Sequence, residues 1–274
     1  MNRYINQLTL LTDKLFSKYK KQINSKEKVG VLVSGGIDSS IVASFCHKHF
    51  SNVTLLSFGT EQSKDKPFVQ ILQKHLDIPL IWLSINDNLV NANLKTVKKI
   101  LEPINLSNSL MHLSLATGYF LICQASKMAG ISNVFTGQGP DVIMAGYNKY
   151  KRLMIQENEK YDSIKQEIIK DLDNLKIDKV RDNSMAFYHK INLINPYLEP
   201  AFVNLCLTIP TKYKLIVSKS SLLLEGKQRG VSLVEKYIER LWGKNLDLPD
   251  EIVWRPKMAF QYSTRVQKLV QKAV

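Results

Sequence analysis

The chain has few cysteines and no long hydrophobic run, and both absences narrow the classes of protein it could be. Its three cysteines, Cys46, Cys123 and Cys206, form no CxxC pair, which argues against a zinc site, an iron–sulfur cluster or a disulfide scaffold. Cys46 and Cys123 stand in apolar helical stretches and are expected to be buried packing residues. No apolar run could span a bilayer, and the charged segment 1–21 lacks the apolar core of a secretory signal. The sequence therefore predicts a cytoplasmic protein with no membrane partner.

Acidic residues are also scarce, since 24 Asp and Glu face 38 Lys and Arg and leave a net charge of +14. Such an excess is typical of proteins with an anionic partner. However, 31 of the basic residues are lysine, Asn and Ile are abundant too, and the densest basic patch is only KYKK at 18–21. A bias in base composition would produce the same excess. A nucleic-acid partner is therefore not favoured, whereas a small polyanionic ligand needs only a few of these charges.

Short apolar runs alternate with helical stretches over the first two-thirds of the chain. This alternation predicts βαβ units and an open parallel sheet with helices on both faces. The expected strands are 29–33, 53–58, 80–85 and 133–136, and the expected helices between them are 38–50, 65–76 and 109–130.

The chain is expected to fall into three parts. Residues 1–27 form an amphipathic helix, residues 28–150 form the α/β core, and residues 151–274 form a helical region. In the third part Ile164, Ile168, Leu172 and Leu175 share one helical face.

The stretch SGGIDSS at 34–40 follows the first predicted strand and opens a helix. Gly35 and Gly36 lack side chains, so backbone N–H groups there can approach a ligand closely. The free N–H groups and partial positive charge of the helix N-terminus favour a bound anion such as phosphate. A carboxylate at Asp38 suits phosphate only if Mg²⁺ lies between them; the alternative is that Asp38 only caps the helix. The hydroxyl donors of this loop are Ser34, Ser39 and Ser40.

A second polar loop, TGQGPD at 136–141, directly follows the strand expected at 133–136. Because both loops follow strands of a parallel sheet, they lie at the same edge, where such sheets bind ligands. Asp38 and Asp141 are therefore expected to share one site.

These loops resemble those of a known family. The first lacks the lysine of GxxxxGK[ST] and resembles the SGGxDS loop of the N-type ATP pyrophosphatases, which cleave ATP between the α and β phosphates. FTGQGPDVIMAGYNKY (135–150) resembles the GEGxDExxGGYxxY segment of asparagine and β-lactam synthetases. NPYLEPAFVNLCLTIPTKYKL resembles their PFLDxxxVxxxxxxPxxxK segment. Two later segments also fit the family. The family's KxxLRE segment is resembled by KSSLLLE, and its LPxxIxxRxKxxF segment is resembled by LPDEIVWRPKMAFQYST. The likeness runs from about residue 28 to residue 264 of this chain.

The resemblance to the asparagine synthetase family implies an adenine nucleotide α-hydrolase-like fold, with ATP and Mg²⁺ as cofactors. In the family a substrate carboxylate attacks the α-phosphate of ATP, and a nitrogen nucleophile then displaces AMP to leave an amide. Family members usually carry an N-terminal glutaminase with a cysteine at position 2, where this chain has Asn2. The expected partners are a small carboxylate substrate and ammonia, an amine or a separate glutaminase subunit.

Four residues stand at positions that have chemical roles in the family. Asp38 and Asp141 match the aspartates that hold Mg²⁺, and Lys219 matches the catalytic lysine that stabilises charge on the phosphates. The alternative for Lys219 is an ordinary surface lysine. Gln138 stands where asparagine synthetases have a glutamate near the attacking nitrogen.

The resemblance also implies a set of ATP contacts. Backbone groups that hold adenine map to Leu32, Val33, Phe58, Gly59, Thr136 and Gly137. Phe58 is equally compatible with a core residue. Arg255 and Lys257 match the RxK segment and are expected to neutralise phosphates, the alternative being ion pairs with Asp250 and Glu251.

Several positions depart from the family pattern, and most lie away from the ATP loops. Glutamine at 138 can hydrogen-bond but cannot accept a proton as a base. The other replacements are at Val142, Asn192, Ile194, Glu199 and Leu223. This distribution favours a carboxylate substrate other than aspartate, or a reduced activity.

Two other interpretations stay open. RNA-modifying enzymes share the SGGxDS loop, and the basic charge favours that class, while the absence of paired cysteines and the fit of the later segments disfavour it. The replaced residues also leave open a degenerate protein that keeps nucleotide binding without catalysis.

Overall fold

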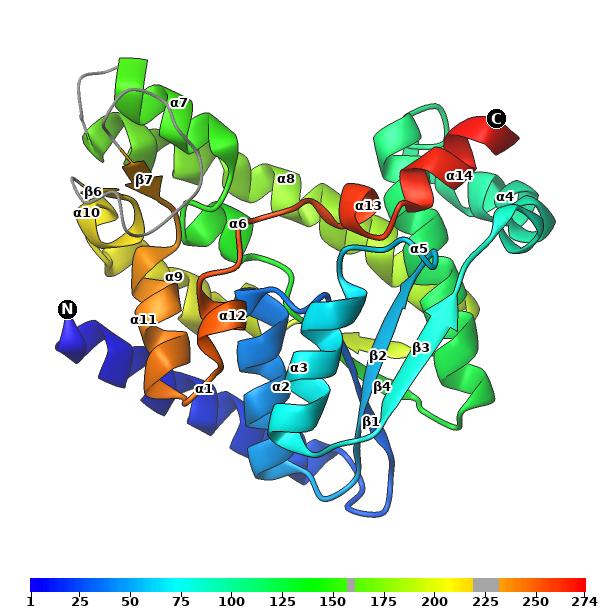
Figure 1. Ribbon diagram of the computed structural model, residues 1–274, viewed down its shortest axis with the longest axis horizontal. Coiled ribbons are helices and arrows are strands. Elements are labelled where there is room, and N and C mark those ends of the chain that lie inside the picture. The colour runs from blue at the N-terminus through cyan, green and yellow to red at the C-terminus, as the bar shows by residue number, and fades with distance from the viewer. Residues whose placement is uncertain (157–160, 219–231) are drawn as a thin grey trace.

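A five-stranded parallel sheet forms the centre of the protein (Figure 1). The computed structural model describes residues 1–156, 161–218 and 232–274. The strand order is β3-β2-β1-β4-β5, and each neighbouring pair is parallel. The strands are β1 (Val29–Leu32), β2 (Val53–Gly59), β3 (Leu80–Ser84), β4 (Asn133–Thr136) and β5 (Asn192–Ile194). The predicted open parallel sheet is therefore confirmed, and its first four strands lie where they were expected.

The fifth strand was not predicted. It has only three residues, lies at an edge of the sheet and begins at the exposed Asn192. So short a segment shows no hydrophobic period, and it interrupts a region expected to be helical.

Helices connect the strands and make up most of the rest of the described chain. The α-helices are α1 (Asn2–Gln22), α2 (Ile37–His49), α3 (Lys66–Leu76), α4 (Asp87–Leu101), α5 (Leu110–Met128), α6 (Pro140–Ile143), α7 (Asn148–Gln156), α8 (Tyr161–Tyr188), α9 (Pro200–Thr208), α10 (Thr211–Lys214), α11 (Tyr237–Asn245), α12 (Asp250–Val253), α13 (Phe260–Ser263) and α14 (Val266–Ala273). The short elements are the 3₁₀ helices Glu102–Ile104 and Pro196–Leu198 and the antiparallel pair β6 (Ile216–Ser218) and β7 (Ser232–Val234). None of the helices in the described ranges is long and apolar enough to cross a membrane.

Apolar side chains cover both faces of the sheet. Because successive strand residues point to opposite faces, Leu55 belongs to the apolar core that contains residues of α1, α2, α3, α9 and α11. Its neighbour Leu56 belongs to the second core, on the other face, which contains residues of α4, α5 and α14. Strands buried on both faces need continuous apolar runs, which is why β1 and β2 are buried throughout.

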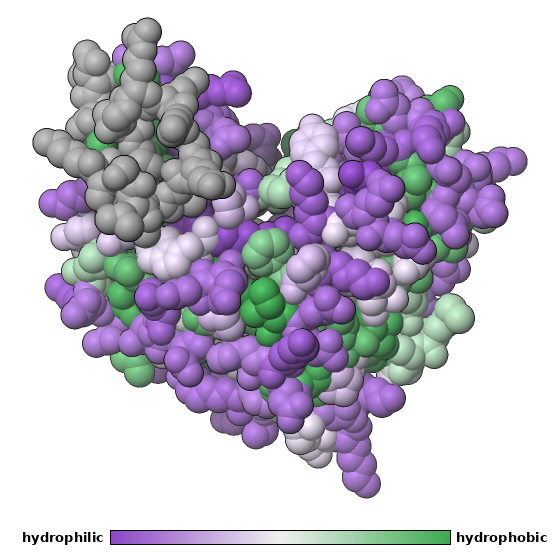
Figure 2. Space-filling view, viewed as in Figure 1, coloured by the Kyte–Doolittle hydropathy of each residue, from purple (hydrophilic) through white to green (hydrophobic). Residues whose placement is uncertain are grey.

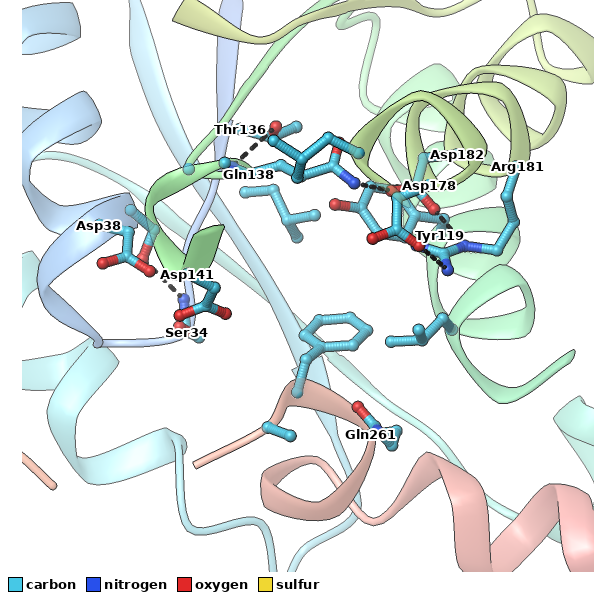
Figure 3. Close-up of a pocket in the computed structure, with 18 of the residues that line it drawn as sticks. Ser34, Asp38, Tyr119, Thr136, Gln138, Asp141, Asp178, Arg181, Asp182 and Gln261 are labelled. Atoms are coloured by element: carbon cyan, nitrogen blue, oxygen red, sulfur yellow. Dashed lines mark hydrogen bonds and ion pairs between the residues drawn. The ribbon is translucent and has the colours of Figure 1, made fainter. Parts of the chain in front are cut away.

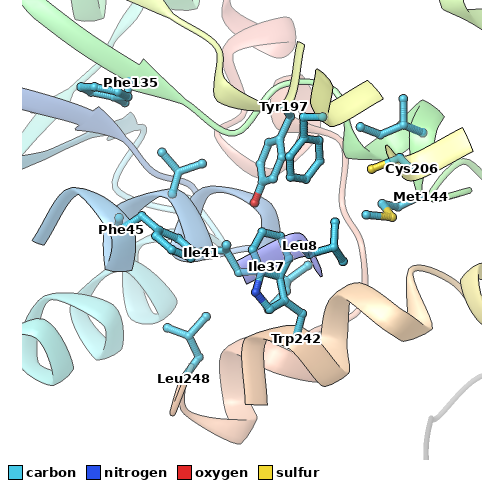
Figure 4. Packing of buried hydrophobic residues seen from close by; sticks show 14 of the residues in the cluster. Leu8, Ile37, Ile41, Phe45, Phe135, Met144, Tyr197, Cys206, Trp242 and Leu248 are labelled. Atoms are coloured by element: carbon cyan, nitrogen blue, oxygen red, sulfur yellow. The ribbon is translucent and has the colours of Figure 1, made fainter. Parts of the chain in front are cut away.

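Trp242 joins the two ends of the chain on the first of these faces. It is fully buried, and Figure 4 places it beside Leu8 of α1 and Ile37 and Ile41 of α2. Its Nε1 donates a hydrogen bond to Thr9 Oγ1 at 3.0 Å. Helices α1 and α11 thus support α2, whose first turn follows the loop after β1.

Residues from all three expected parts of the chain contribute to the same cores. Residues of α1, α2 and α11 share one cluster, and residues of α5, α8 and α14 share the other. The boundaries near residues 27 and 150 stay a prediction. All three buried cysteines are free, which confirms the packing role expected for Cys46 and Cys123.

The strand order reverses between β1 and β4, which lie side by side at the centre of the sheet. In open α/β sheets ligands bind beyond the carboxyl ends of the strands at such a point. The loops that follow β1 and β4 are the two polar loops singled out from the sequence. The fold therefore places both SGGIDSS and TGQGPD at the point of the sheet where ligands are expected to bind.

Arg255 connects the C-terminal part of the chain to the loop after β1. Its Nη1 donates to the Ser34 carbonyl oxygen, and its Nη2 donates to Asp65 Oδ1 at 2.6 Å. The guanidinium also lies 4.1 Å from the centre of the Phe68 ring. Both members of the Arg255–Asp65 pair are buried. Burial raises the pKa of Asp65, and Arg255 opposes that rise.

We expect Arg255→Ala to lower the free energy of unfolding by about 3–5 kcal/mol, because it leaves the Asp65 carboxylate buried without its cation. Lys244→Ala is the matched control, since Lys244 pairs with Asp250 at the surface and such a pair contributes about 1 kcal/mol or less. Urea unfolding followed by tryptophan fluorescence measures both. Equal losses in the two variants would contradict the anchoring role of Arg255.

Candidate active site

Two carboxylates from the two central loops converge on one buried ammonium group. Lys236 Nζ lies 2.7 and 2.6 Å from the two carboxylate oxygens of Asp38 and 2.6 Å from Asp141 Oδ1. Asp38 belongs to the first turn of α2, and Asp141 belongs to α6. Figure 3 shows the two aspartates on the same side of a cavity. Residues 103 positions apart in the chain (141 minus 38) therefore form one site.

Lys236 is held tightly in this position. Its side chain is only 4% exposed, and its backbone adopts a left-handed conformation with φ of 54°, which is uncommon for a residue other than glycine. A Cβ atom on Gly146 would lie 2.1 Å from Lys236 Cε, so only glycine leaves room for the lysine there. Burial lowers the pKa of Lys236, but Asp141 and Asp38 outweigh burial and raise it above its usual value. The amine is therefore protonated.

The same arrangement fits a magnesium ion bound together with phosphates. Mg²⁺ is commonly held by one or two carboxylates plus substrate phosphates and water. The ammonium of Lys236 shows that the two aspartates accept a cation between them. No cluster of three or more His, Cys, Asp or Glu that could hold a metal occurs in the described part of the chain. Asp38 and Asp141 would therefore need ligand oxygens to complete the coordination.

A second lysine extends this positive charge. Lys257 forms an ion pair with Asp141 Oδ2 and lies 4.5 Å from the centre of the Tyr147 ring. Burial raises the pKa of Asp141, yet Lys236 and Lys257 outweigh that effect and hold the pKa well below its usual range. The Asp141 carboxylate is therefore ionised between two ammonium groups.

The loop after β1 is shaped by its own serines and glycines. Ser34 N donates to Ser39 Oγ at 3.2 Å, Gly36 N donates to Ser34 Oγ at 3.3 Å, and Ser40 Oγ donates to the Gly36 carbonyl oxygen at 2.8 Å. Gly35 has φ of 69°, and a Cβ there would lie 2.4 Å from Phe68 Cβ. The loop thus delivers the chain to α2, whose first N–H groups have no partner within the helix.

The loop after β4 packs directly against this helix end. A Cβ on Gly137 would lie 2.6 Å from the backbone nitrogen of Ser39, so glycine is required for the close approach. The phenol of Tyr197 donates to the Asp38 carbonyl oxygen at 3.0 Å and fixes the same turn from another side.

A cavity of about 280 Å³ lies between the two loops, α5, α8 and α13. Beside α13, Figure 2 shows a notch in the mostly hydrophilic surface of this face. Ten of the residues expected from the sequence line the cavity: Leu32, Val33, Ser34, Asp38, Ser39, Thr136, Gly137, Gln138, Asp141 and Lys257. The expected residues outside this lining are Gly35, Gly36, Ser40, Phe58, Gly59 and Arg255.

Three of the expected residues need separate comment. Phe58 is buried and packs edge-on against Phe260, 4.8 Å between ring centres, which fits the core role considered for it. Arg255 binds Asp65 rather than Asp250 or Glu251. Lys219 lies outside the described residues, so its catalytic role stays a prediction.

Polar side chains also gather at the other end of the cavity, across from the two aspartates (Figure 3). Gln138 Nε2 donates to Asp182 Oδ2 at 2.9 Å, and Arg181 Nε donates to Asp182 Oδ1 at 2.7 Å. Arg181 Nη1 donates to Asp178 Oδ1 at 2.7 Å and to His112 Nδ1 at 3.0 Å. Because arginine can only donate, the His112 ring is neutral.

Burial controls the protonation of these groups. It raises the pKa of Asp182 to about 6, although Arg181 opposes the rise. It also lowers the pKa of His112, and the positive charge of Arg181 lowers it further. Asp182 is therefore ionised at neutral pH but titrates close to it.

Lys236, Asp178, Arg181 and Asp182 were not singled out from the sequence. For Lys236 a signal was present: KYIER at 236–240 has the lysine and the arginine of KxxLRE at their spacing, whereas KSSLLLE lacks the arginine. The three residues of α8 belong to none of the sequence motifs described above.

A doubly wound parallel sheet with polar loops at its switch point is typical of α/β proteins that bind a ligand there. The family model for asparagine synthase matches residues 11–174 and 156–273, so the chain belongs to the asparagine synthase family. One relative is a putative asparagine synthetase of Methanocaldococcus jannaschii. It is 27% identical to this chain, and the match covers 92% of this chain and 48% of the relative's own length. Asparagine synthetases of Saccharomyces cerevisiae (26%) and Homo sapiens (24%) each match 88% of this chain, and 46% and 40% of their own lengths. The chain thus spans less than half the length of these relatives.

Two solved structures are distantly similar. An NH3-dependent NAD synthetase from Campylobacter jejuni has a TM-score of 0.39 at 17% identity, over 67% of this chain and 92% of its own. An NMN synthetase from Francisella tularensis has a TM-score of 0.41 at 12% identity, over 99% of this chain and 86% of its own.

We expect Lys236→Met to bind Mg²⁺ more tightly than the unmodified chain when no nucleotide is present, by about threefold to tenfold. The reason is that the metal no longer has to displace an ammonium group from Asp38 and Asp141. Isothermal titration with MgCl2 measures this, with Lys244→Met as the control. A lower affinity in Lys236→Met would contradict a shared cation position.

A second expectation concerns Asp182. Its folded pKa of about 6 exceeds the ordinary value of 3.8, so the folded state binds the proton more tightly than the unfolded state does. The stability gained from this group is complete below about pH 4 and is lost as pH rises through 6, by up to about 3 kcal/mol. Asp182→Asn should remove that part of the pH dependence, whereas Asp173→Asn, an exposed residue of the same helix, should keep it. Urea unfolding between pH 4 and 7 decides the matter, and identical profiles in all three proteins would refute it.

Proposed function

We propose that this chain uses ATP and Mg²⁺ to adenylate a carboxylate and then transfers ammonia or an amine to it, forming an amide. Membership of the asparagine synthase family supports an ATP-dependent carbon–nitrogen ligase. The observation that carries the proposal is the buried cation site made by Asp38, Asp141 and Lys236 at the switch point of the sheet.

In the first step a substrate carboxylate oxygen forms a bond to the α-phosphorus of ATP. The bond from this phosphorus to the bridging oxygen breaks, and pyrophosphate leaves with the electron pair. Mg²⁺, held by Asp38 and Asp141, would neutralise charge on the departing phosphates. Lys236 and Lys257 place two fixed ammonium groups beside the same carboxylates. Fixed cations stabilise the transition state without reorganising.

The rest of the nucleotide is expected along the carboxyl ends of β1 and β4. Leu32, Val33, Thr136 and Gly137 line the cavity there, and their backbone groups are available to adenine. The free N–H groups at the start of α2 favour a phosphate. Adenine contacts from Phe58 and Gly59, and phosphate contacts from Arg255, stay predictions.

In the second step the nitrogen attacks the activated carbonyl carbon, and AMP leaves with the electron pair of the broken bond. The nitrogen must lose a proton. Gln138 cannot accept it, but Asp182 lies 2.9 Å from the Gln138 amide and its pKa is raised to about 6. Asp182, which also lines this end of the cavity, is therefore the carboxylate proposed to receive the proton.

The source of nitrogen belongs to the proposal as well. The named asparagine synthetases are described as glutamine-hydrolysing, and this chain spans less than half of each. Free ammonia, an amine or a separate glutaminase subunit are the candidate sources. A cytoplasmic location is also proposed, and membership of the asparagine synthase family supports it.

The test is pyrophosphate release from ATP and Mg²⁺ with a panel of carboxylic acids, with and without ammonium. We expect release that depends on one acid and falls at least a hundredfold in Asp38→Ala, because the cation site is broken. Asp250→Ala, an exposed carboxylate paired with Lys244, should keep full activity.

Other outcomes separate the alternatives. Release only in the presence of tRNA would support an RNA-modifying enzyme. Nucleotide binding without release under any condition would support a degenerate binding protein, and the ligase proposal would then be wrong.

A further inference from the structure

A cavity of about 350 Å³ lies along β5, the strand at the edge of the sheet. All three residues of this strand line the edge cavity, together with residues at the end of α1 and the start of α9. None of its lining residues lines the cavity of the candidate active site. The edge cavity is therefore separate from the site proposed for ATP.

Three positions that depart from the family pattern line the edge cavity. Asn192 and Ile194 belong to β5, and Glu199 stands where the family's PFLD segment ends in aspartate. The fold thus brings half of the six replaced positions described above to one cavity. Its lining is therefore particular to this chain, and a ligand bound there would not be one that the family pattern requires.

The lining carries one negative and one positive side chain. Glu199 Oε1 accepts a hydrogen bond from the Tyr19 phenol at 2.8 Å, and Glu199 Oε2 has no donor among the described residues. Lys179 is exposed and forms no ion pair within the described ranges. A ligand with a negative charge alone would face Glu199, and one with a positive charge alone would face Lys179. The lining therefore favours a ligand that carries both charges.

A buried amide adds a hydrogen-bond donor to this lining. Asn195 is only 9% exposed, and its Oδ1 accepts a hydrogen bond from Thr136 Oγ1. Asn195 Nδ2 has no acceptor in the described part of the chain and still keeps accessible surface. A donor in this position is satisfied by a ligand oxygen, and a charged carboxylate makes the stronger bond.

The loop after β4 separates the two cavities. Thr136 and Gly139 line the active-site cavity, whereas Asn195 and Leu198 line the edge cavity. Thr136 donates its hydroxyl hydrogen bond to Asn195 across this wall. Gly139 and Leu198 pack closely, since a Cβ on Gly139 would lie 2.9 Å from Leu198 Cδ2. A ligand that fixes Asn195 would therefore also restrain the loop that lines the active site.

We propose that the edge cavity binds a small zwitterionic amino acid and that the bound molecule orders the loop after β4. Lys179 and Asn195 Nδ2 hold its carboxylate, and Glu199 holds its ammonium group. The inference goes beyond the proposed ligase function, because this ligand binds outside the active site and does not react.

Isothermal titration of the full chain without nucleotide tests the class of ligand. Alanine, asparagine and glutamine are compared with propionate, which lacks the ammonium group, and with ethylamine, which lacks the carboxylate. We expect the best amino acid to bind at least tenfold more tightly than either. Equally tight binding of propionate or ethylamine, or no binding of any of the three amino acids, would overturn the inference.

Substitutions test the place of binding. Lys179→Gln and Glu199→Gln should each weaken binding of that amino acid at least tenfold. Lys176→Gln, an exposed residue of the same helix outside the cavity, should leave it unchanged. Glutamine at position 199 can still accept from Tyr19, and urea unfolding shows whether the fold is kept.

Asp38→Ala separates the edge cavity from the active site. It should bind the amino acid as the unmodified chain does, because Asp38 lines the other cavity. Binding that is lost in Asp38→Ala but kept in Lys179→Gln would place the ligand in the active site and reject the inference.

Amide hydrogen exchange tests the effect on the loop. A saturating amino acid should slow exchange at residues 137–139 at least threefold, because the ordered loop opens less often. Thr136→Val removes the hydroxyl that donates to Asn195 and should abolish this slowing while the amino acid still binds. Unchanged exchange in the unmodified chain, or slowing that persists in Thr136→Val, would refute the proposed link.

Pyrophosphate release, measured as described above, distinguishes this inference from the ligase. Amino-acid binding that orders the loop without release under any condition would keep the inference and reject the ligase. Release from a chain whose edge cavity binds none of the amino acids would keep the ligase and reject the inference.

Discussion

The structure of this site depends on one shared cation. Asp38 and Asp141 come from different loops and carry the same charge, and the ammonium of Lys236 lies between them. Two carboxylates this close would repel each other without it. Lys236 comes from a third part of the chain, 198 residues after Asp38. The contact therefore joins both central loops to the C-terminal region.

Backbone geometry makes that contact possible. Gly137 lets the loop after β4 approach the first turn of α2, and Gly146 leaves space for the Lys236 side chain. Arg255 then ties the segment after α12 to the Ser34 carbonyl oxygen and to Asp65. Because these contacts are all within the protein, the cation site is formed in advance of any ligand. Preorganised charge of this kind is what electrostatic catalysis requires.

Much of the fold and of the site could be predicted from the sequence. The features that could not be predicted were missed for physical reasons. Strands buried on both faces appear in the sequence as continuous apolar runs. The polar stretches SGGIDSS and TGQGPD indicate the loops that follow two of these strands. Lys236 is one of 31 lysines, and only folding selects it. Strand β5 is too short for a period, and Asp182 meets Gln138 across 44 residues. Local sequence patterns therefore predict the strands, helices and loops, whereas contacts between residues far apart in the chain are known only from the folded structure.

The most direct measurement is a crystal structure with Mg²⁺ and a non-cleavable ATP analogue. The account predicts the metal between Asp38 and Asp141 on the analogue's phosphates, with the Lys236 ammonium moved from the carboxylates to a phosphate oxygen. An analogue bound elsewhere, with Lys236 still in contact with both aspartates, would contradict it.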